Sequence, residues 1–136
     1  MNQPLQIGLS ATRRVDIDAG RTINFMGSDC HVYSTPNLVY DVDLACRDLL
    51  LEHIEPGKGS VCTRVELDHV GPTLIGMWVD ITVTLISING GAVIFEFTAT
   101  DALGEVARGK HSRFIVGIEK IAQRLKSKLA RAMGQA

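Results

Sequence analysis

A change of hydrophobic periodicity in the middle of the chain constrains the fold most. Before it, residues 35–54 carry apolar side chains at helical spacing, and Pro36 suits the first turn, where its missing N–H costs nothing. Either Ser34 or Thr35 can cap this helix, and the proline- and glycine-containing segment 55–60 ends it. After it, apolar residues recur with a period of two, as in strands. This order predicts an α+β fold in which an antiparallel sheet wraps over one long helix.

The second half of the chain divides into strand-like segments and a tail. The segments are rich in β-branched residues and are separated by turns, of which Asn89-Gly90-Gly91 is a strong hairpin signal. They cover residues 60–70, 77–88, 92–101 and 106–117. A further strand is expected over residues 5–15, before the helix. The tail, residues 118–133, is expected to form a basic amphipathic helix that lies on the surface or docks on the sheet.

Length and composition favour a single domain that spans residues 1–136. Hydrophobic residues make up 46% of the chain and charged residues 21%, which is near the average of globular proteins and argues against disorder. The net charge of −1 gives no electrostatic reason to expect nucleic-acid binding. No apolar run reaches the roughly 18 residues of a membrane span, so no membrane partner is expected.

The cysteines suggest a reducing compartment. Cys30, Cys46 and Cys62 are odd in number and widely spaced, which predicts free thiols rather than a disulfide framework. The first residues lack a basic stretch followed by an apolar one, so no secretory signal is expected and the cytoplasm is the predicted location. No cluster of histidine, cysteine and aspartate has the spacing of metal ligands, so no metal is expected.

Two acids of the helix, Asp41 and Asp43, cannot face the same way because they are two residues apart. On a helical wheel, Leu38, Val42, Ala45 and Leu49 form the core stripe. Asp43 borders the apolar flank made by Val39, Cys46 and Leu50, whereas Asp41 falls on the side expected to face solvent. Placing a carboxylate against apolar surface costs free energy, so such a group is expected to have a charged or hydrogen-bonding partner or to serve a function. Asp43 is therefore either a functional acid or a partly exposed one, for instance paired with Arg47.

Several motifs occur in a defined order over residues 30–115. They are the Thr-Pro helix start with an acid eight residues later, the EPGKGS turn, the TRVELDHVGPTLIG segment, the hairpin and GKHSRF. In their order and spacing the chain resembles a single-domain hot-dog thioesterase, of the branch that includes fluoroacetyl-CoA thioesterase. The resemblance implies a hot-dog fold, in which a long central helix is wrapped by an antiparallel sheet, here with an added C-terminal helix.

The resemblance also implies functional residues. The family threonine at the helix start matches Thr35, and the family histidine near the end of the next strand matches His69. The position of the family glutamate holds Asp43, which is one methylene shorter. A backbone N–H that contacts the acyl carbonyl would be that of Cys62, and an arginine that contacts CoA would be Arg113. The loop of residues 27–30 offers no aromatic lid of the kind implied for the fluoroacetyl specialist.

The implied reaction is hydrolysis of a small acyl-CoA thioester. In one route Thr35 attacks, His69 takes its proton and Asp43 orients the imidazole. In the other, a carboxylate or imidazole base activates water and Thr35 positions it. The start of the helix would favour a developing oxyanion through its N–H groups and dipole. No cofactor is expected, since CoA belongs to the substrate.

Two other functions are alternatives. The first is a hot-dog dimer that binds an acyl-CoA or another small ligand without turnover, which the aspartate at the glutamate position would favour. The second is an acyl-CoA hydratase or dehydratase, although the helix start has no histidine after His31. The resemblance implies a homodimer, with a tetramer as the larger alternative, because the family's sites lie between two subunits.

Overall fold

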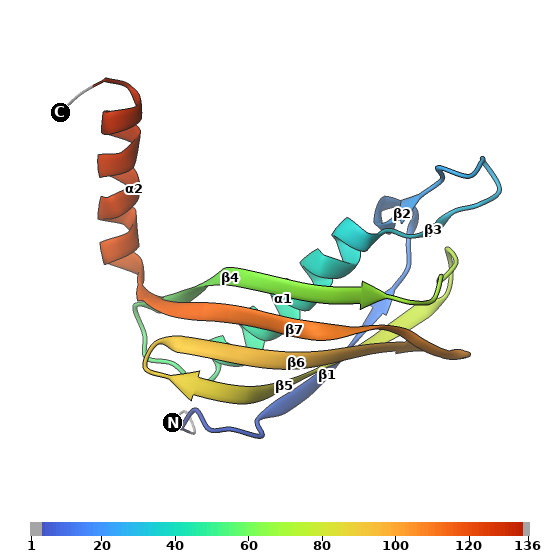
Figure 1. Cartoon of the computed structure of the whole chain (residues 1–136), viewed down its shortest axis with the longest axis horizontal. Helices are drawn as coiled ribbons and strands as arrows, with labels where there is room; N and C mark the ends of the chain where they lie inside the picture. Colours follow the sequence, from blue (N-terminus) through green and yellow to red (C-terminus); the bar gives the residue numbers. More distant parts are fainter. Residues whose placement is uncertain (1–3, 135–136) are drawn as a thin grey trace.

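The computed structural model describes residues 4–134, which form a five-stranded antiparallel sheet packed against one long helix (Figure 1). The strand order in the sheet is β1-β5-β6-β7-β4. The sheet strands are β1 (Ser10–Asp16), β4 (Lys58–His69), β5 (Trp78–Asn89), β6 (Ala92–Asp101) and β7 (Gly104–Gly117). The α+β class, with an antiparallel sheet packed on the long helix, is therefore confirmed. Only β5, β6 and β7 follow one another as a meander, because β4 pairs with β7 at the edge and not with β5, the next strand in sequence.

The remaining elements lie outside this sheet. The central helix α1 spans Thr35–Leu51 and ends three residues earlier than the periodicity predicts. The 3-10 helix η1 (Ala19–Arg21) and a two-stranded sheet of β2 (Thr22–Ile23) and β3 (Val32–Tyr33) precede it. The C-terminal helix α2 spans Ile118–Ala132. Neither α1 nor α2, the two α-helices of the described part of the chain, is long and apolar enough to cross a bilayer.

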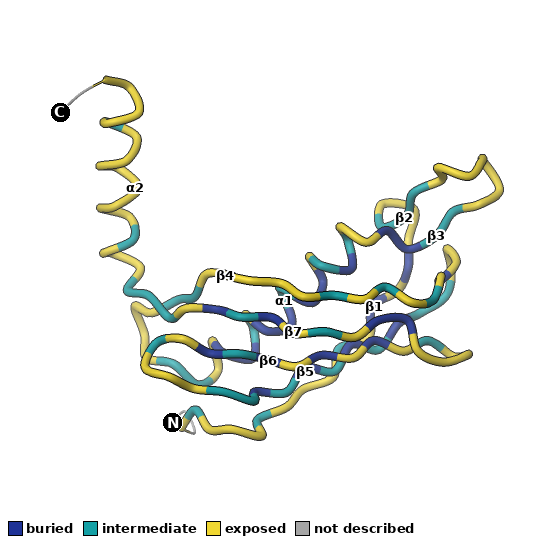
Figure 2. The backbone as a smooth tube through the Cα atoms, viewed as in Figure 1, coloured by how far each residue is buried: buried dark blue, intermediate teal, exposed yellow. Residues whose placement is uncertain are grey.

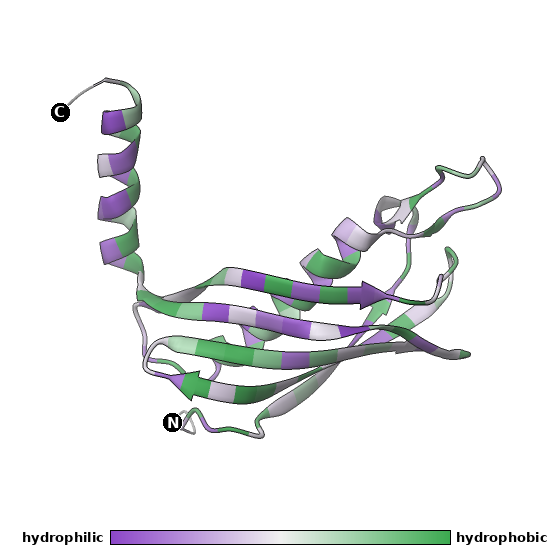
Figure 3. Cartoon of the chain, viewed as in Figure 1, coloured by the Kyte–Doolittle hydropathy of each residue, from purple (hydrophilic) through white to green (hydrophobic). Residues whose placement is uncertain are grey.

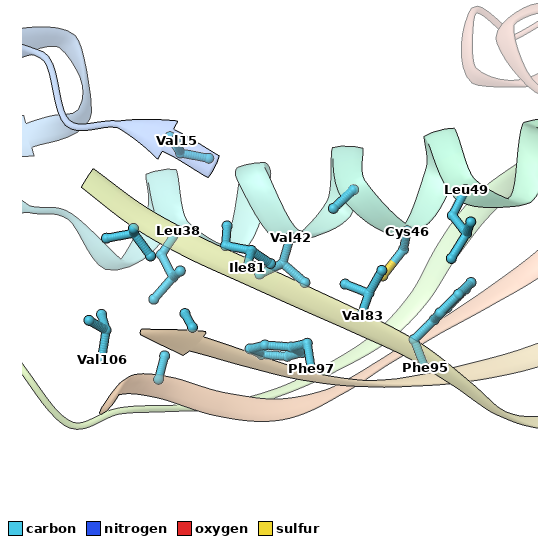
Figure 4. Close-up of a cluster of buried hydrophobic side chains, with 14 of the residues drawn as sticks. Val15, Leu38, Val42, Cys46, Leu49, Ile81, Val83, Phe95, Phe97 and Val106 are labelled. Atoms are coloured by element: carbon cyan, nitrogen blue, oxygen red, sulfur yellow. The ribbon is translucent and has the colours of Figure 1, made fainter. Parts of the chain in front are cut away.

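The core lies between α1 and the concave face of the sheet. Figure 4 shows apolar side chains of α1 facing those of the central strands β5 and β6. The predicted stripe of Leu38, Val42, Ala45 and Leu49 is buried, which confirms the helical wheel on this side. Full burial of each large apolar side chain contributes about 1.5–3 kcal/mol, so this contact is the main source of stability.

The edge strand β4 is much more exposed than β7, the strand beside it (Figure 2). It pairs with β7 on one side only, so the N–H and C=O groups of its other side have no partner strand among residues 4–134. Its exposed residues include the apolar Val61 and Val65. A twelve-residue edge of this kind is a template for pairing with another chain.

Helix α2 leaves the end of β7 and projects away from the sheet, past the edge strand β4 (Figure 1). None of its residues is buried, so of the two predicted placements the structure has the surface one. Apolar and charged residues alternate along it, as Figure 3 shows, because Ile121, Leu125 and Leu129 lie on one side among lysines and arginines. The helix is thus an amphipathic arm.

The prediction that Asp41 faces solvent is wrong. Asp41 is 3% exposed, and its carboxylate accepts hydrogen bonds from the Tyr33 hydroxyl (2.5 Å) and Arg21 Nε (3.0 Å). Arg21 and Tyr33, from the segment that precedes α1, reach this side of the helix and cover the carboxylate, which a helical wheel drawn for the sheet-facing stripe leaves open to solvent. Burial and the Asp41 carboxylate raise the pKa of Tyr33, so the phenol stays protonated and can donate.

Replacing Tyr33 with phenylalanine tests the importance of this buried pair. Tyr33→Phe is expected to lower the free energy of unfolding by about 1.5–3 kcal/mol, because a buried carboxylate loses a donor. Urea denaturation followed by circular dichroism measures the change. Tyr40→Phe is the matched control, since Tyr40 is 57% exposed and its loss of a hydroxyl should cost less than about 0.5 kcal/mol. Equal effects of the two substitutions would show that the Asp41 contact is not stabilising.

Candidate active site

The start of α1 leaves the Thr35 hydroxyl free for another role. Ser34 is the N-cap, and its Oγ accepts from the Asn37 backbone N–H at 3.2 Å. This settles which of the two hydroxyl residues caps the helix. Thr35 is therefore the first helical residue, exposed to solvent, and its side chain does not satisfy the helix end.

Thr35 and His69 are brought together by elements that are distant in sequence. Thr35 Oγ1 lies 2.8 Å from His69 Nδ1, a hydrogen bond that joins the start of α1 to the last residue of β4. A pocket of about 290 Å³ opens at this pair, and its other walls are mostly apolar. They comprise Ile23, Val32, Tyr33, Val70, Gly71 and Pro72. A hydroxyl that is hydrogen-bonded to an imidazole at a helix N-terminus can act as a nucleophile itself, or the pair can activate a water molecule.

The surroundings of His69 favour its neutral form. Burial lowers the pKa of His69, and a contact with the Gly71 backbone partly opposes this shift. The ring meets that of Tyr33 edge-on, with centroids 6.4 Å apart. Its Nε2 atom is enclosed and has no hydrogen-bond partner among residues 4–134. Near neutral pH this imidazole can accept a proton, as a general base must.

Asp43 belongs to a second polar group, beneath the middle of β4. Its carboxylate forms an ion pair with Arg113, and its Oδ1 lies 3.2 Å from His111 Nε2. Arg113 also donates from Nε to the Ser60 hydroxyl (2.7 Å) and from a terminal nitrogen to the Ser60 carbonyl (3.0 Å). Arg113 is only 3% exposed, so it is an internal partner of Asp43 in this subunit. The pairing with Arg47 considered from the sequence does not occur.

Cys62 completes this second group. It lies opposite Arg113 in the β4–β7 ladder, at a register shift that leaves Thr63 without a pairing partner. Its thiol, a nitrogen of His111 and an oxygen of Asp43 all lie within 4.8 Å of one another, which is a possible set of metal ligands. The Arg113 guanidinium already neutralises Asp43 there, however, and burial together with Arg113 lowers the pKa of His111. The set is better explained as an internal ion pair than as a cation site.

The five residues expected at one site thus form two groups in the subunit. Thr35 and His69 form the first group, and Asp43, Cys62 and Arg113 form the second. Eight residues of helix separate Thr35 from Asp43, which corresponds to about 12 Å. Seven residues of strand separate Cys62 from His69, which corresponds to about 23 Å. The expectation that Asp43 orients His69 is therefore not met within one subunit.

Some residues of the site were missed from the sequence. Tyr33 links Asp41 to His69, and Ser60 fixes Arg113, yet neither lies in a pattern that predicts such a role. Phe25 and Met26 are 84% and 87% exposed just before the loop of residues 27–30, in which no aromatic was expected. Aromatic surface is therefore available close to this loop, although not within it.

Comparisons with known proteins agree with this architecture. The sequence model of the family described as fluoroacetyl-CoA-specific thioesterase matches residues 17–119. The fluoroacetyl-CoA thioesterase of Streptantibioticus cattleyicolor is 29% identical over 97 residues, which cover 71% of this chain and 70% of that protein.

Solved structures confirm the hot-dog fold. A fluoroacetyl-CoA thioesterase superposes with a TM-score of 0.84 at 23% identity, covering 93% of this chain and 98% of the other. A thioesterase superfamily member from Thermus thermophilus gives 0.88 at 24% identity, covering 98% and 99%. A hot-dog-like protein from Thermanaerovibrio acidaminovorans gives 0.82 at 22% identity, covering 90% and 91%. The chain belongs to the fluoroacetyl-CoA-specific thioesterase family and is a thioester hydrolase with the hot-dog fold.

Proposed function

We propose that this protein hydrolyses the thioester of a small acyl-CoA between Thr35 and His69. The observation that carries the proposal is the 2.8 Å contact between the Thr35 hydroxyl and the His69 imidazole, inside a mostly apolar pocket of about 290 Å³. Relatives support the substrate class, since one is named a fluoroacetyl-CoA thioesterase and one solved relative is in complex with acetyl-CoA. The proposal names no particular acyl group, because the loop of residues 27–30 has no aromatic residue and the neighbouring Phe25 is 84% exposed.

Two routes are compatible with this pair. In the first, His69 Nδ1 takes the proton of the Thr35 hydroxyl while Oγ1 attacks the carbonyl carbon. The carbon–sulfur bond then breaks, His69 returns the proton to the CoA thiolate, and water hydrolyses the threonyl ester. In the second, the pair holds and deprotonates a water that attacks directly. Both use His69 as the base, and neither needs a cofactor.

The developing oxyanion needs donors that the start of α1 supplies poorly. Pro36 has no N–H, and the Asn37 N–H already donates to Ser34. The helix dipole remains, but few free N–H groups accompany it. We therefore assign the oxyanion contact to the backbone N–H of Cys62, with Asp43 and Arg113 beside it. These residues belong to the second group, which is too far from Thr35 in the same subunit.

A homodimer would reunite the two groups. The exposed edge of β4 offers backbone groups and apolar residues for antiparallel pairing with the same strand of a second copy. Such pairing places the His69 end of one strand toward the middle and the Lys58 end of the other. We propose that Thr35 and His69 of one subunit act with Asp43, Cys62 and Arg113 of the other. A cytoplasmic location belongs to the same proposal, since all three cysteines are free thiols.

Release of free thiol from a panel of acyl-CoAs, from acetyl to long-chain and aryl, tests the activity. The wild type is expected to release CoA from small acyl-CoAs, and His69→Ala should lower kcat/KM at least about a hundredfold, because the base is lost. His53→Ala, just beyond the C-terminal end of α1, is the control and should change kcat/KM less than about twofold. Absence of release from every member would contradict the proposal and favour ligand binding without turnover.

The pH dependence of kcat/KM should reflect the lowered pKa of His69. A base is active when neutral, so activity is kept above its pKa and falls as pH drops below it. Because burial places this pKa below the ordinary value of 6.5, the midpoint of the acidic decline in kcat/KM should lie below pH 6.5. A decline centred at or above pH 6.5 would exclude a desolvated His69 as the base.

Mixed dimers test whether the site is shared. His69→Ala and Asp43→Asn homodimers should each be nearly inactive. A mixed dimer contains one site that has both wild-type residues if they come from different subunits, so it should recover up to about half of the activity per dimer. If His69 and Asp43 acted within one subunit, no intact site would form and mixing would restore nothing. Size-exclusion chromatography with light scattering verifies that the dimers have exchanged subunits.

A further inference from the structure

A groove at the foot of α2 combines basic and apolar side chains. It encloses about 260 Å³ where the end of β7 turns into the helix and the start of β4 lies beside it. Three cations line it: Lys58 from β4, and Lys120 and Arg124 from the first two turns of α2. Phe114, which is 45% exposed, forms part of its apolar wall.

The three cations of this groove have no acidic partner. Lys58, Lys120 and Arg124 form no ion pair within residues 4–134, whereas other arginines, such as Arg14 with Asp80, are paired. Helix α2 carries five basic residues and one acid, Glu119, although the whole chain has a net charge of −1. Positive charge is thus concentrated on one arm of an otherwise acidic protein. Such a surface attracts an anionic ligand.

We propose that this groove, which we call the α2 groove, binds the phosphate groups of CoA while the thioester is held at the catalytic residues. The inference rests on the proposed function, because it takes acyl-CoA as the substrate. Phosphate groups would bind Lys58, Lys120 and Arg124, and the uncapped N-terminus of α2 would add its dipole. The exposed ring of Phe114 offers an apolar surface to the adenine base.

The position of Lys58 along β4 determines to which of the two active sites of a dimer the groove belongs. Lys58 is four residues from Cys62, or about 13 Å along the strand, and Phe114 directly follows Arg113. Lys58 is eleven residues from His69, or about 36 Å, too far for one CoA molecule to reach from its thioester. The groove therefore serves the site to which its own subunit gives Asp43, Cys62 and Arg113, and to which the partner gives Thr35 and His69.

A triple substitution and a charge-matched control test the α2 groove. The groove variant is Lys58→Ala, Lys120→Ala and Arg124→Ala, and the control is Lys126→Ala, Lys128→Ala and Arg131→Ala, farther along α2. All of these side chains are exposed, so both variants should fold. The groove variant should raise KM for the preferred acyl-CoA about tenfold or more, with kcat nearly unchanged. The same acyl group on pantetheine, which lacks the phosphates, should show no difference.

The outcomes separate this inference from the proposed hydrolysis. The control variant should change KM for acyl-CoA less than about threefold. If KM rose equally in the two variants, the cause would be the loss of positive charge in general, and the inference would be overturned. An unchanged KM in the groove variant would also overturn it, while loss of activity in His69→Ala would still support hydrolysis. If no acyl-CoA is turned over, calorimetry with CoA decides the inference. Binding weakened about tenfold only by the groove variant supports it, and equal binding by all three proteins overturns it.

Discussion

The packing of one helix into a curved antiparallel sheet is the contact on which the rest of the structure depends. The apolar stripe of α1 meets side chains of β5 and β6, and nearly every residue of this interface is fully buried. Because the helix lies across the sheet, its start projects at one end and its flank passes under the edge strand. Thr35 therefore reaches His69 at the end of β4, whereas Asp43 reaches Arg113 near the middle of that strand.

Polar residues on so enclosed a helix each need a partner, and the partners determine their roles. Asp41 obtains its hydrogen bonds from Tyr33 and Arg21, and the Tyr33 ring in turn contacts His69. The carboxylate is thus structural, yet it holds the ring that forms part of the wall of the pocket. Asp43 instead neutralises a buried arginine, whose charge would otherwise be costly in the interior. Two neighbouring acids on one helix therefore serve different purposes.

The two groups of the site and the open edge of the sheet all depend on strand β4. Strand β4 carries His69 at one end, Cys62 near its middle and Lys58 at the other end, and no strand of residues 4–134 pairs with its outer side. A second copy at this edge would satisfy those groups and bring together residues that a single subunit keeps apart. The same strand would then connect the reacting thioester with the basic α2 groove. Dimer formation and substrate binding would depend on one element.

The sequence by itself determined the helix and the strands, because periodicity and turn residues are local properties of the chain. The match of β6 to the predicted residues 92–101 and the burial of the Leu38 stripe illustrate this. Motif order also pointed to Thr35 and His69, which the structure brings into contact. The order of the strands in the sheet, with β4 beside β7 and β1 beside β5, was decided by the tertiary structure. Only the tertiary structure decided that Asp41 is buried and that Asp43 pairs with Arg113. Those outcomes depend on Arg21, Tyr33 and Arg113, which reach α1 from outside the helix. A helical wheel contains no information about what covers each side.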